Sequence, residues 1–461
     1  MSQVSEPIPA YPKFTKAMKA THTILIPNMA PVQFAIMKAA MEHAGYKVEV
    51  LGNCGSSVAQ LGLKYVHNDT CYPALLVIGQ FLDALQSGKY DLDRTALLIT
   101  QTGGGCRASN YIHLLRKALA KAGYGQVPVA SLNFSGLEKD SGFELTLPLL
   151  RGLLAGIFYG DLLCALRSQT QPYELHRGDA EAKTRQWLET LCGWVRRGQG
   201  VSMRAVKRTM PLIASDFAAI PKKVAPKVKV GVVGEIYVKY SPLGNNGLER
   251  FLADEGCEVN LPGLLGFVEY CIYNMAETTR LYGGSAASVL GPDALLAWLD
   301  GGEQAMRKAL TQYGYHAPAA FKTLTKLPEG IIGMGNKMGE GWLLTAEMIE
   351  LVQAGYENIV CAQPFGCLPN HICGKGMINR IRALYPAANI TPIDYDPSAT
   401  PVNQENRIKL MLAVARERLE TGEKPGPGAA GTAKNEGKNP FYGEMPRLRH
   451  TGPRAAAPAR G

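Results

Sequence analysis

Short apolar runs alternate with segments of helical periodicity through the first part of the chain. The run THTILIP is strand-like, residues 31–44 carry apolar side chains at helical spacing, and KVEVL is again strand-like. An apolar strand at residues 96–100 then leads through three glycines into an amphipathic helix, followed by PVASL. This alternation predicts an α/β fold with a mostly parallel, doubly wound sheet.

The pattern changes at residue 143 and again at residue 227. Residues 143–206 follow a helical pattern and lack strand-like alternation, which predicts a helical connection. The strand KVKVGVVGE, a helix near 248–255 and the strand CEVNL predict a second α/β lobe. A helix over 342–354, the strand NIVCA, a helix near 371–384 and the strand NITPID predict a further βαβ unit.

We therefore expect two or three Rossmann-like doubly wound lobes with a helical connection and a ligand site between the lobes. The chain of 461 residues is long enough for this arrangement. The expected parts are an N-terminal extension (1–21), a first α/β lobe (22–142), a helical connection (143–225), a second α/β lobe (226–325), a final βαβ unit (326–420) and a disordered basic tail (421–461). The tail has too little apolar content to fold.

Composition and charge narrow the functional classes. Hydrophobic residues make up 46% and charged residues 19% of the chain, which is typical of a globular enzyme. Seven basic residues against three acidic ones in the tail supply +4 of the formal charge of +10. Because no basic-aromatic module accompanies this charge, we expect no nucleic-acid partner. The start lacks a signal sequence and no apolar run reaches roughly 18 residues, so we expect a cytoplasmic protein without a membrane span.

Ten cysteines in a cytoplasmic chain are better interpreted as metal ligands, reactive thiols or core residues than as disulfides. Cys71 precedes Pro73 and thus a predicted helix, and Cys106 follows the glycine run. Cys361 ends the strand NIVC, and Cys367 lies in the next loop. Ligands of parallel sheets bind beyond the carboxyl ends of strands, so we expect these thiols to converge on one pocket.

The remaining cysteines are expected to be small buried hydrophobic residues. This interpretation applies most strongly to three cysteines in apolar helical stretches, Cys164, Cys192 and Cys271. It applies less strongly to Cys54 and Cys257, and Cys373 is ambiguous. Zinc is disfavoured at the four candidate ligands because the chain has no C-x-x-C pair, whereas iron-sulfur clusters take cysteine preferentially. Gly104 and Gly105 are expected to let the backbone approach such a bulky group.

At these same residues the chain resembles the superfamily of 2-hydroxyacyl-CoA dehydratases, benzoyl-CoA reductases and double-cubane cluster proteins. It is most similar to the acyl-CoA dehydratase activase-related subgroup. The resemblance covers most of residues 22–415 and is carried by KYVHNDTCYPALLVIGQFLDAL, LLITQTGGGCRASNYI, VGVVGEIYVKYSPLGNNGLERFL, GEGWLLTAEMIEL, NIVCAQPFGCLPNHICGKGMINRIR and IDYDPSATPVNQENRIKLML.

The resemblance implies an iron-sulfur cluster held by about three cysteines per cubane. It assigns Cys71, Cys106 and Cys367 as ligands, with Cys361 next. The cluster is either [4Fe-4S] or a sulfide-bridged double cubane, and a homo-oligomer or a related second subunit is left open. The chain has neither a Walker A motif nor a dinucleotide fingerprint, so the ATP-hydrolysing iron-sulfur activator that the resemblance implies is expected to be a separate protein.

Two functional hypotheses follow from the resemblance. The first is an oxygen-sensitive reductase or a radical 2-hydroxyacyl-CoA dehydratase-like component, and the second is a non-catalytic module for low-potential electron transfer or cluster delivery. A zinc-containing or metal-free thiol protein is the third alternative. The weaker candidates for catalytic groups are His67, Glu235, Lys239 and His371, for which a solvated loop charge or a position beside a helix cap is the competing interpretation.

Overall fold

The computed structural model describes residues 11–67, 70–101, 105–133, 142–223 and 225–422. Within this part the chain forms two four-stranded sheets with the orders β2-β1-β3-β4 and β6-β5-β7-β8, and every paired strand is parallel. The first sheet consists of β1 (Thr23–Ile26), β2 (Lys47–Val50), β3 (Thr95–Gln101) and β4 (Val129–Asn133). The second consists of β5 (Lys229–Gly234), β6 (Glu258–Asn260), β7 (Asn358–Pro364) and β8 (Asn389–Tyr395). The predicted doubly wound α/β architecture is confirmed.

Each sheet has one point at which the strand order reverses. In the first sheet β1 pairs with β2 on one side and with β3 on the other. In the second sheet β5 pairs with β6 and with β7 in the same way. The segments that follow β3, β5 and β7 therefore leave the sheets at their switch points, where open parallel sheets bind ligands.

Two helices of the first lobe, α3 and α4, pack with their backbones in close contact. Its helices are α2 (Pro31–His43), α3 (Ser56–Tyr65), α4 (Tyr72–Gln86) and α5 (Tyr111–Ala122). A Cβ atom at Gly62 of α3 would lie 2.2 Å from the carbonyl oxygen of Leu75, and one at Gly79 of α4 would lie 2.0 Å from that of Val58. The two backbones thus approach too closely for any side chain at these glycines. This contact fixes α4, whose N-terminus carries Cys71.

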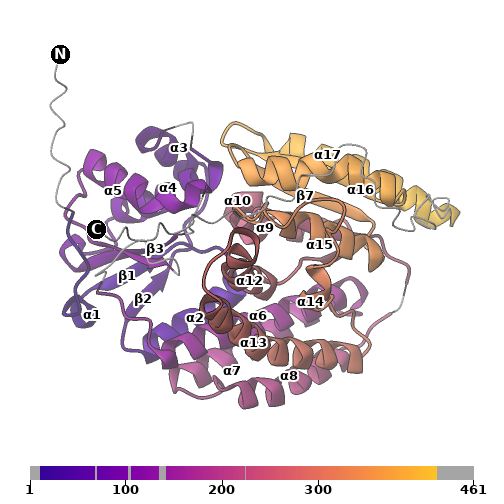
Figure 1. The fold of residues 1–461 in the computed structure, drawn as a ribbon, viewed down its shortest axis with the longest axis horizontal. Helices are drawn as coiled ribbons and strands as arrows, with labels where there is room; N and C mark the ends of the chain where they lie inside the picture. The colour runs from indigo at the N-terminus through magenta and orange to yellow at the C-terminus, as the bar shows by residue number, and fades with distance from the viewer. Residues whose placement is uncertain (1–10, 68–69, 102–104, 134–141, 224, 423–461) are drawn as a thin grey trace, which may run out of the picture.

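The range predicted as a helical connection is helical, and further helices pack against it. Helices α6 (Leu147–Thr170), α7 (Asp179–Arg196) and α8 (Met203–Ala218) occupy the predicted range. Helices α12 (Leu264–Tyr282) and α13 (Ala287–Gln312) pack with them in the lower part of Figure 1, and the short helix α14 (Phe321–Leu324) contacts α15. The assignment of all of residues 226–325 to the second α/β lobe is therefore wrong, because residues after β6 pack on α6 and α8.

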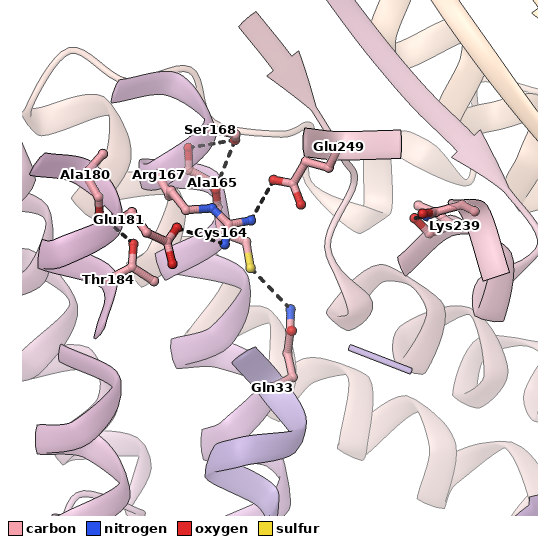
Figure 2. Close-up of polar contacts among 11 residues, drawn as sticks. Gln33, Cys164, Ala165, Arg167, Ser168, Ala180, Glu181, Thr184, Lys239 and Glu249 are labelled. Atoms are coloured by element: carbon pink, nitrogen blue, oxygen red, sulfur yellow. Dashed lines mark hydrogen bonds and ion pairs between the residues drawn. The ribbon is translucent and has the colours of Figure 1, made fainter. Parts of the chain in front are cut away.

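Helix α6 is the central helix of this layer. The segment Leu147–Tyr173 is long and apolar enough to cross a membrane, but 72% of its most apolar window is buried within the protein. Core helices of soluble proteins meet the same criterion, so this is weak evidence for a span. Figure 2 shows Arg167 of α6 beside Glu249 and Glu181, with nitrogen–oxygen distances of 2.7 and 3.8 Å. These ion pairs tie α6 to α7 and to α11 (Leu248–Asp254).

The final βαβ unit completes the second sheet. Strand β7 lies beside β5, and β8 lies beside β7 at the edge of the sheet. Helices α15 (Trp342–Gln353), α16 (Ile378–Leu384) and α17 (Pro401–Thr421) complete the upper right part of Figure 1. Helix α17 includes Thr421, so the predicted start of the tail is one residue too early, and residues 423–461 lie outside the described part. One apolar cluster contains Leu75 and Leu97 of the first lobe together with Val230 and Val360 of the second. The two lobes therefore share a core.

Candidate functional site

Three of the predicted cysteines lie at the beginnings of helical turns. Cys71 is the N-cap of α4, and Cys106 is the N-cap of the short helix η2 (Arg107–Asn110) that follows β3. Cys367 follows β7 and precedes the π-helix η4 (Asn370–Gly374). Short π-helices occur frequently at functional sites. Only Cys106 and Cys367 follow strands, because α3 rather than a strand precedes Cys71.

Backbone contacts bring the three segments together. The N–H of Tyr72 donates a hydrogen bond to the carbonyl of Phe365 over 3.0 Å. A Cβ atom at Gly366, where φ is +74°, would lie 3.2 Å from the Cα of Cys71. A Cβ atom at Gly339, where φ is +59°, would lie 3.1 Å from Pro369 and 3.9 Å from the Sγ of Cys106. Glycine at both positions permits the turn and the close approach.

The three thiols share an electrostatic environment. Burial raises the pKa of Cys106 to about 11, with further increases from Glu340, Glu235 and the thiol of Cys71. Burial also raises the pKa of Cys367, to which Glu340, Glu235 and Cys106 add. Burial likewise raises the pKa of Cys71, and Glu235 adds to it. Glu235 thus acts on all three thiols, which places them around one site.

A backbone amide opposes the raised pKa at each of these sulfurs. The amides belong to Ala74 for Cys71, Ala108 for Cys106 and Asn370 for Cys367, and each lowers the pKa of its thiol. An N–H group that faces sulfur favours the thiolate over the thiol. In each of the three turns, therefore, one backbone amide stabilises negative charge on the cysteine sulfur.

Two glutamates lie next to the thiols. Glu235 caps α9 (Ile236–Tyr240) by accepting a 2.9 Å hydrogen bond from the N–H of Val238, and Glu340 accepts one of 3.0 Å from the N–H of Ile236. Burial and the nearby Glu340 raise the pKa of Glu235 to about 8. This carboxyl group therefore holds a proton near neutral pH. Glu340 was not predicted, although an acidic residue between two glycines before a buried helix is a usable signal.

Tyr111 and Met338 contact the cysteine turns from α5 and from the loop before α15. The hydroxyl of Tyr111 lies 3.0 Å from the Sγ of Cys71, and the N–H of Gly105 donates to the Sδ of Met338 over 3.1 Å. A Cβ atom at Gly105 would lie 3.6 Å from Met338, which is an ordinary contact, so no described contact requires glycine there. Gly104, the other predicted cofactor-binding glycine, lies outside the described residues.

We expect Tyr111→Phe to raise the pKa of Cys71 in the metal-free protein. The tyrosine hydroxyl lowers this pKa, so its removal should move the midpoint of Cys71 alkylation to higher pH. The pH profile of Cys71 alkylation by iodoacetamide, followed by mass spectrometry, measures the shift. Tyr124→Phe is the control. An unchanged midpoint in the Tyr111 variant would contradict the role of this hydrogen bond.

Lys239 forms a buried ion pair that acts on Glu340. Its Nζ is 2.8 and 2.9 Å from the two carboxylate oxygens of Glu347 of α15, and both side chains are only 5% exposed. The interpretation of Lys239 as a solvated loop charge is therefore wrong. Both members of the pair act on Glu340, whose pKa is raised chiefly by burial and lowered by Lys239. The ion pair thus helps to set the charge state of the carboxyl groups near the thiols.

The two predicted histidines are exposed. His67 follows α3 and adjoins residues 68 and 69, which lie outside the described part. His371 lies in η4, and its Nδ1 is 2.6 Å from the Nε2 of Gln363. The described contacts do not identify either imidazole as a catalytic group.

Cys361 occupies a different environment from the other three candidates. It lies within β7 rather than at its end, is fully buried, and belongs to an apolar cluster with Met348 and Ile359. Burial raises its pKa to about 12, and the charged groups that act on it are Asp394, Lys375 and Glu347. The three converging thiols are not among them. The strand therefore directs Cys361 into the core, and the loop after it carries Cys367 to the site.

The other cysteines partly follow expectation. Cys192, Cys257 and Cys373 are buried, and Cys164 is half-buried beside Gln33 (Figure 2). Cys54 and Cys271 are exposed, so their assignment to the core is wrong. Cys54 lies in the loop before α3. Cys271 lies on α12, where burial of the thiol and the nearby Glu340 raise its pKa to about 12.

Single metal ions and iron-sulfur clusters place different requirements on their ligands. Among the described residues, no group of three or more His, Cys, Asp or Glu side chains is placed to hold one metal ion. A four-iron cluster binds each thiolate through a different iron, so its ligands lie farther apart than those of one ion. Three separated thiols with amides directed at the sulfurs fit this requirement.

Comparisons with known proteins do not identify a family for this chain. No protein-family model matches the chain. No curated protein matches it either. The resemblance found in the sequence therefore stays a prediction.

Proposed function

We propose that this chain binds an iron-sulfur cluster through Cys71, Cys106 and Cys367, as [4Fe-4S] or as part of a sulfide-bridged double cubane. One observation carries the proposal: three thiols from both lobes share Glu235 as a neighbour, and each meets a backbone amide. Cysteine thiolates are the usual ligands of such clusters, and amides directed at sulfur tune their potentials.

We further propose that the protein is a low-potential reductase or a radical 2-hydroxyacyl-CoA dehydratase-like component. Three thiols leave one iron of a cubane without a protein thiolate, and Cys361 is not placed to complete the set. An open iron favours catalysis over a non-catalytic electron-transfer or cluster-delivery module. The bound cluster would supply one-electron transfer at low potential. Glu235 and Glu340 would hold and release protons beside it.

The proposed partner is a separate ATP-hydrolysing iron-sulfur activator protein. The resemblance supports this partner, and the chain itself carries no nucleotide motif. A cytoplasmic location agrees with free thiols and an oxygen-sensitive cluster. A homo-oligomer or a related second subunit would be needed if the second cubane of a double cubane were held elsewhere.

We expect reduction of the reconstituted cluster by the activator to require Mg-ATP hydrolysis. Electron paramagnetic resonance of anaerobic mixtures should show the reduced signal with Mg-ATP and no signal with a non-hydrolysable analogue. The Cys106→Ser variant provides the matched control, because the activator would hydrolyse ATP without a cluster to reduce. Full turnover with a reduced ferredoxin and no nucleotide would contradict the proposed partner.

A further inference from the structure

A second candidate site lies in the helical layer, between α12, α13 and α14. It is a half-open cavity of about 260 Å³, and its walls include the aromatic rings of Tyr273 and Phe321 and the side chain of Leu296. The two rings meet edge to face with centroids 5.9 Å apart. The lining residues include none of the cysteines or glutamates of the thiol site. The cavity is therefore a separate feature of the fold.

Four acidic side chains line this cavity, and two of them have no cationic partner. Asp293 is paired with Arg280 and Asp300 with Lys322, at nitrogen–oxygen distances of 2.7 and 3.3 Å. Glu269 is only 2% exposed and lines the cavity, yet it has no hydrogen-bond or ion-pair partner in the described part of the chain.

Glu303 is the second acidic side chain without a cationic partner. It is 5% exposed, and its Oε1 accepts a 2.7 Å hydrogen bond from the N–H of Phe321. Glu269 and Glu303 thus both line the cavity, and of the two only Glu303 accepts a backbone N–H in the described part of the chain. Buried carboxylates are ordinarily paired with a cation, so the pair requires a proton or a positively charged ligand.

The surrounding charges agree with this requirement. Burial, Glu303, Asp300 and the more distant Asp161 of α6 all raise the pKa of Glu269, to about 9. Arg307 of α13 and Lys322 of α14 lower the pKa of Glu303, but burial outweighs them and this pKa is also raised. The positive charges of the protein thus leave the two inner carboxyl groups under-compensated.

We propose that this cavity binds a small organic amine as its ammonium ion. The ammonium group donates hydrogen bonds to Glu269 and Glu303, and the apolar body packs against Tyr273 and Phe321. Aromatic rings also attract a cation placed over their faces. A metal ion fits less well, because these side chains do not form a metal-ligand group and the walls are largely apolar.

Binding of the amine should release a proton. Below the pKa of Glu269 the carboxyl group is protonated, and it must ionise to pair with the ammonium group. Affinity should therefore increase as the pH rises from 6 toward about 9, as long as the amine itself stays protonated.

Isothermal titration calorimetry of the full chain with phenethylamine tests the proposal. At pH 7, titrations in phosphate and in Tris should show release of about one proton per amine bound. Glu269→Gln should fold with a similar Tm, because it replaces a carboxyl group that is protonated in the free protein with a neutral amide of similar shape, and should bind the amine at least about tenfold more weakly. The matched control is Glu350→Gln, which alters a buried carboxyl group that accepts an N–H from Ala319 outside the cavity and should leave binding unchanged.

Several results would overturn the assignment. These are absence of phenethylamine binding at millimolar concentration, equal binding of the neutral 2-phenylethanol, equal binding by Glu269→Gln, or displacement of the amine by Mg²⁺ at stoichiometric concentration. Iron content plays no part in the measurement, so its outcome is independent of the proposed cluster.

Discussion

Serine at Cys71, Cys106 or Cys367 is expected to remove most of the iron and sulfide from the reconstituted protein. A serine hydroxyl is a much weaker ligand for iron than a thiolate, and each of these sulfurs faces a backbone amide that favours the anionic ligand. Each substitution would remove one of three protein ligands. Iron and sulfide assays with visible absorption spectra, after identical anaerobic reconstitution, measure the loss.

Three other cysteines provide matched controls. Cys192→Ser changes a buried core residue, Cys271→Ser an exposed residue, and Cys361→Ser a thiol on the neighbouring strand. The buried variants should lose about 1–3 kcal/mol of stability for an unpaired hydroxyl and should keep their iron. If the first three variants retained wild-type iron, sulfide and spectra, the assignment of the ligands would be wrong.

Lys239→Met is expected to lower the free energy of unfolding of the metal-free protein by about 3–5 kcal/mol. The substitution leaves the Glu347 carboxylate buried without its partner, which costs far more than the net value of the intact pair. Urea unfolding followed by circular dichroism measures the change. The double variant with Lys239→Met and Glu347→Leu, which replaces the ion pair with two apolar side chains, should recover most of the lost free energy of unfolding.

The loss in Lys239→Met should grow with pH. Burial raises the pKa of Glu347 above its unfolded value, and Lys239 opposes this increase. Without the lysine the folded-state pKa rises further, so stability is retained at pH 4–5 and lost as the pH rises toward and through the folded pKa. Arg177→Ala, which breaks a pair in which the arginine is 90% exposed, should cost at most about 1 kcal/mol. Equal losses in the two variants would contradict the importance of the buried pair.

The sequence predicted the sheets well because their strands are short apolar runs with local boundaries. Helix α3 was missed although its sequence SSVAQLGLKY is amphipathic, because the helix is only 10 residues long and its position depends on the contact of Gly62 with α4. Helices α12 and α13 were missed although Pro262 and Gly263 mark the end of β6, because their packing partners α6 and α8 lie far away in the sequence. These elements depend on tertiary contacts more than on local pattern.

The residues of the candidate site were also predictable only where the local sequence carries a signal. Cys71, Cys106 and Cys367 have local signals, namely a following proline, a preceding glycine run and a position after a strand. Tyr111 reaches the thiols only through the tertiary fold, and Glu340 has a local signal in its two flanking glycines, but only the tertiary fold places it beside the thiols. The alternation of side chains along β7 places Cys361 in the core. The sequence pattern predicted that this strand ends at Cys361 instead of Pro364, and for that reason Cys361 was included among the candidate ligands.

Iron and acid-labile sulfide content of the anaerobically purified wild-type protein, with electron paramagnetic resonance after reduction, tests the central claim most directly. The account predicts about four iron and four sulfide ions per chain, or about twice that for a complete double cubane, and a signal from the reduced cluster. Zinc in place of iron, or a protein without metal that resists reconstitution with iron and sulfide, would contradict it.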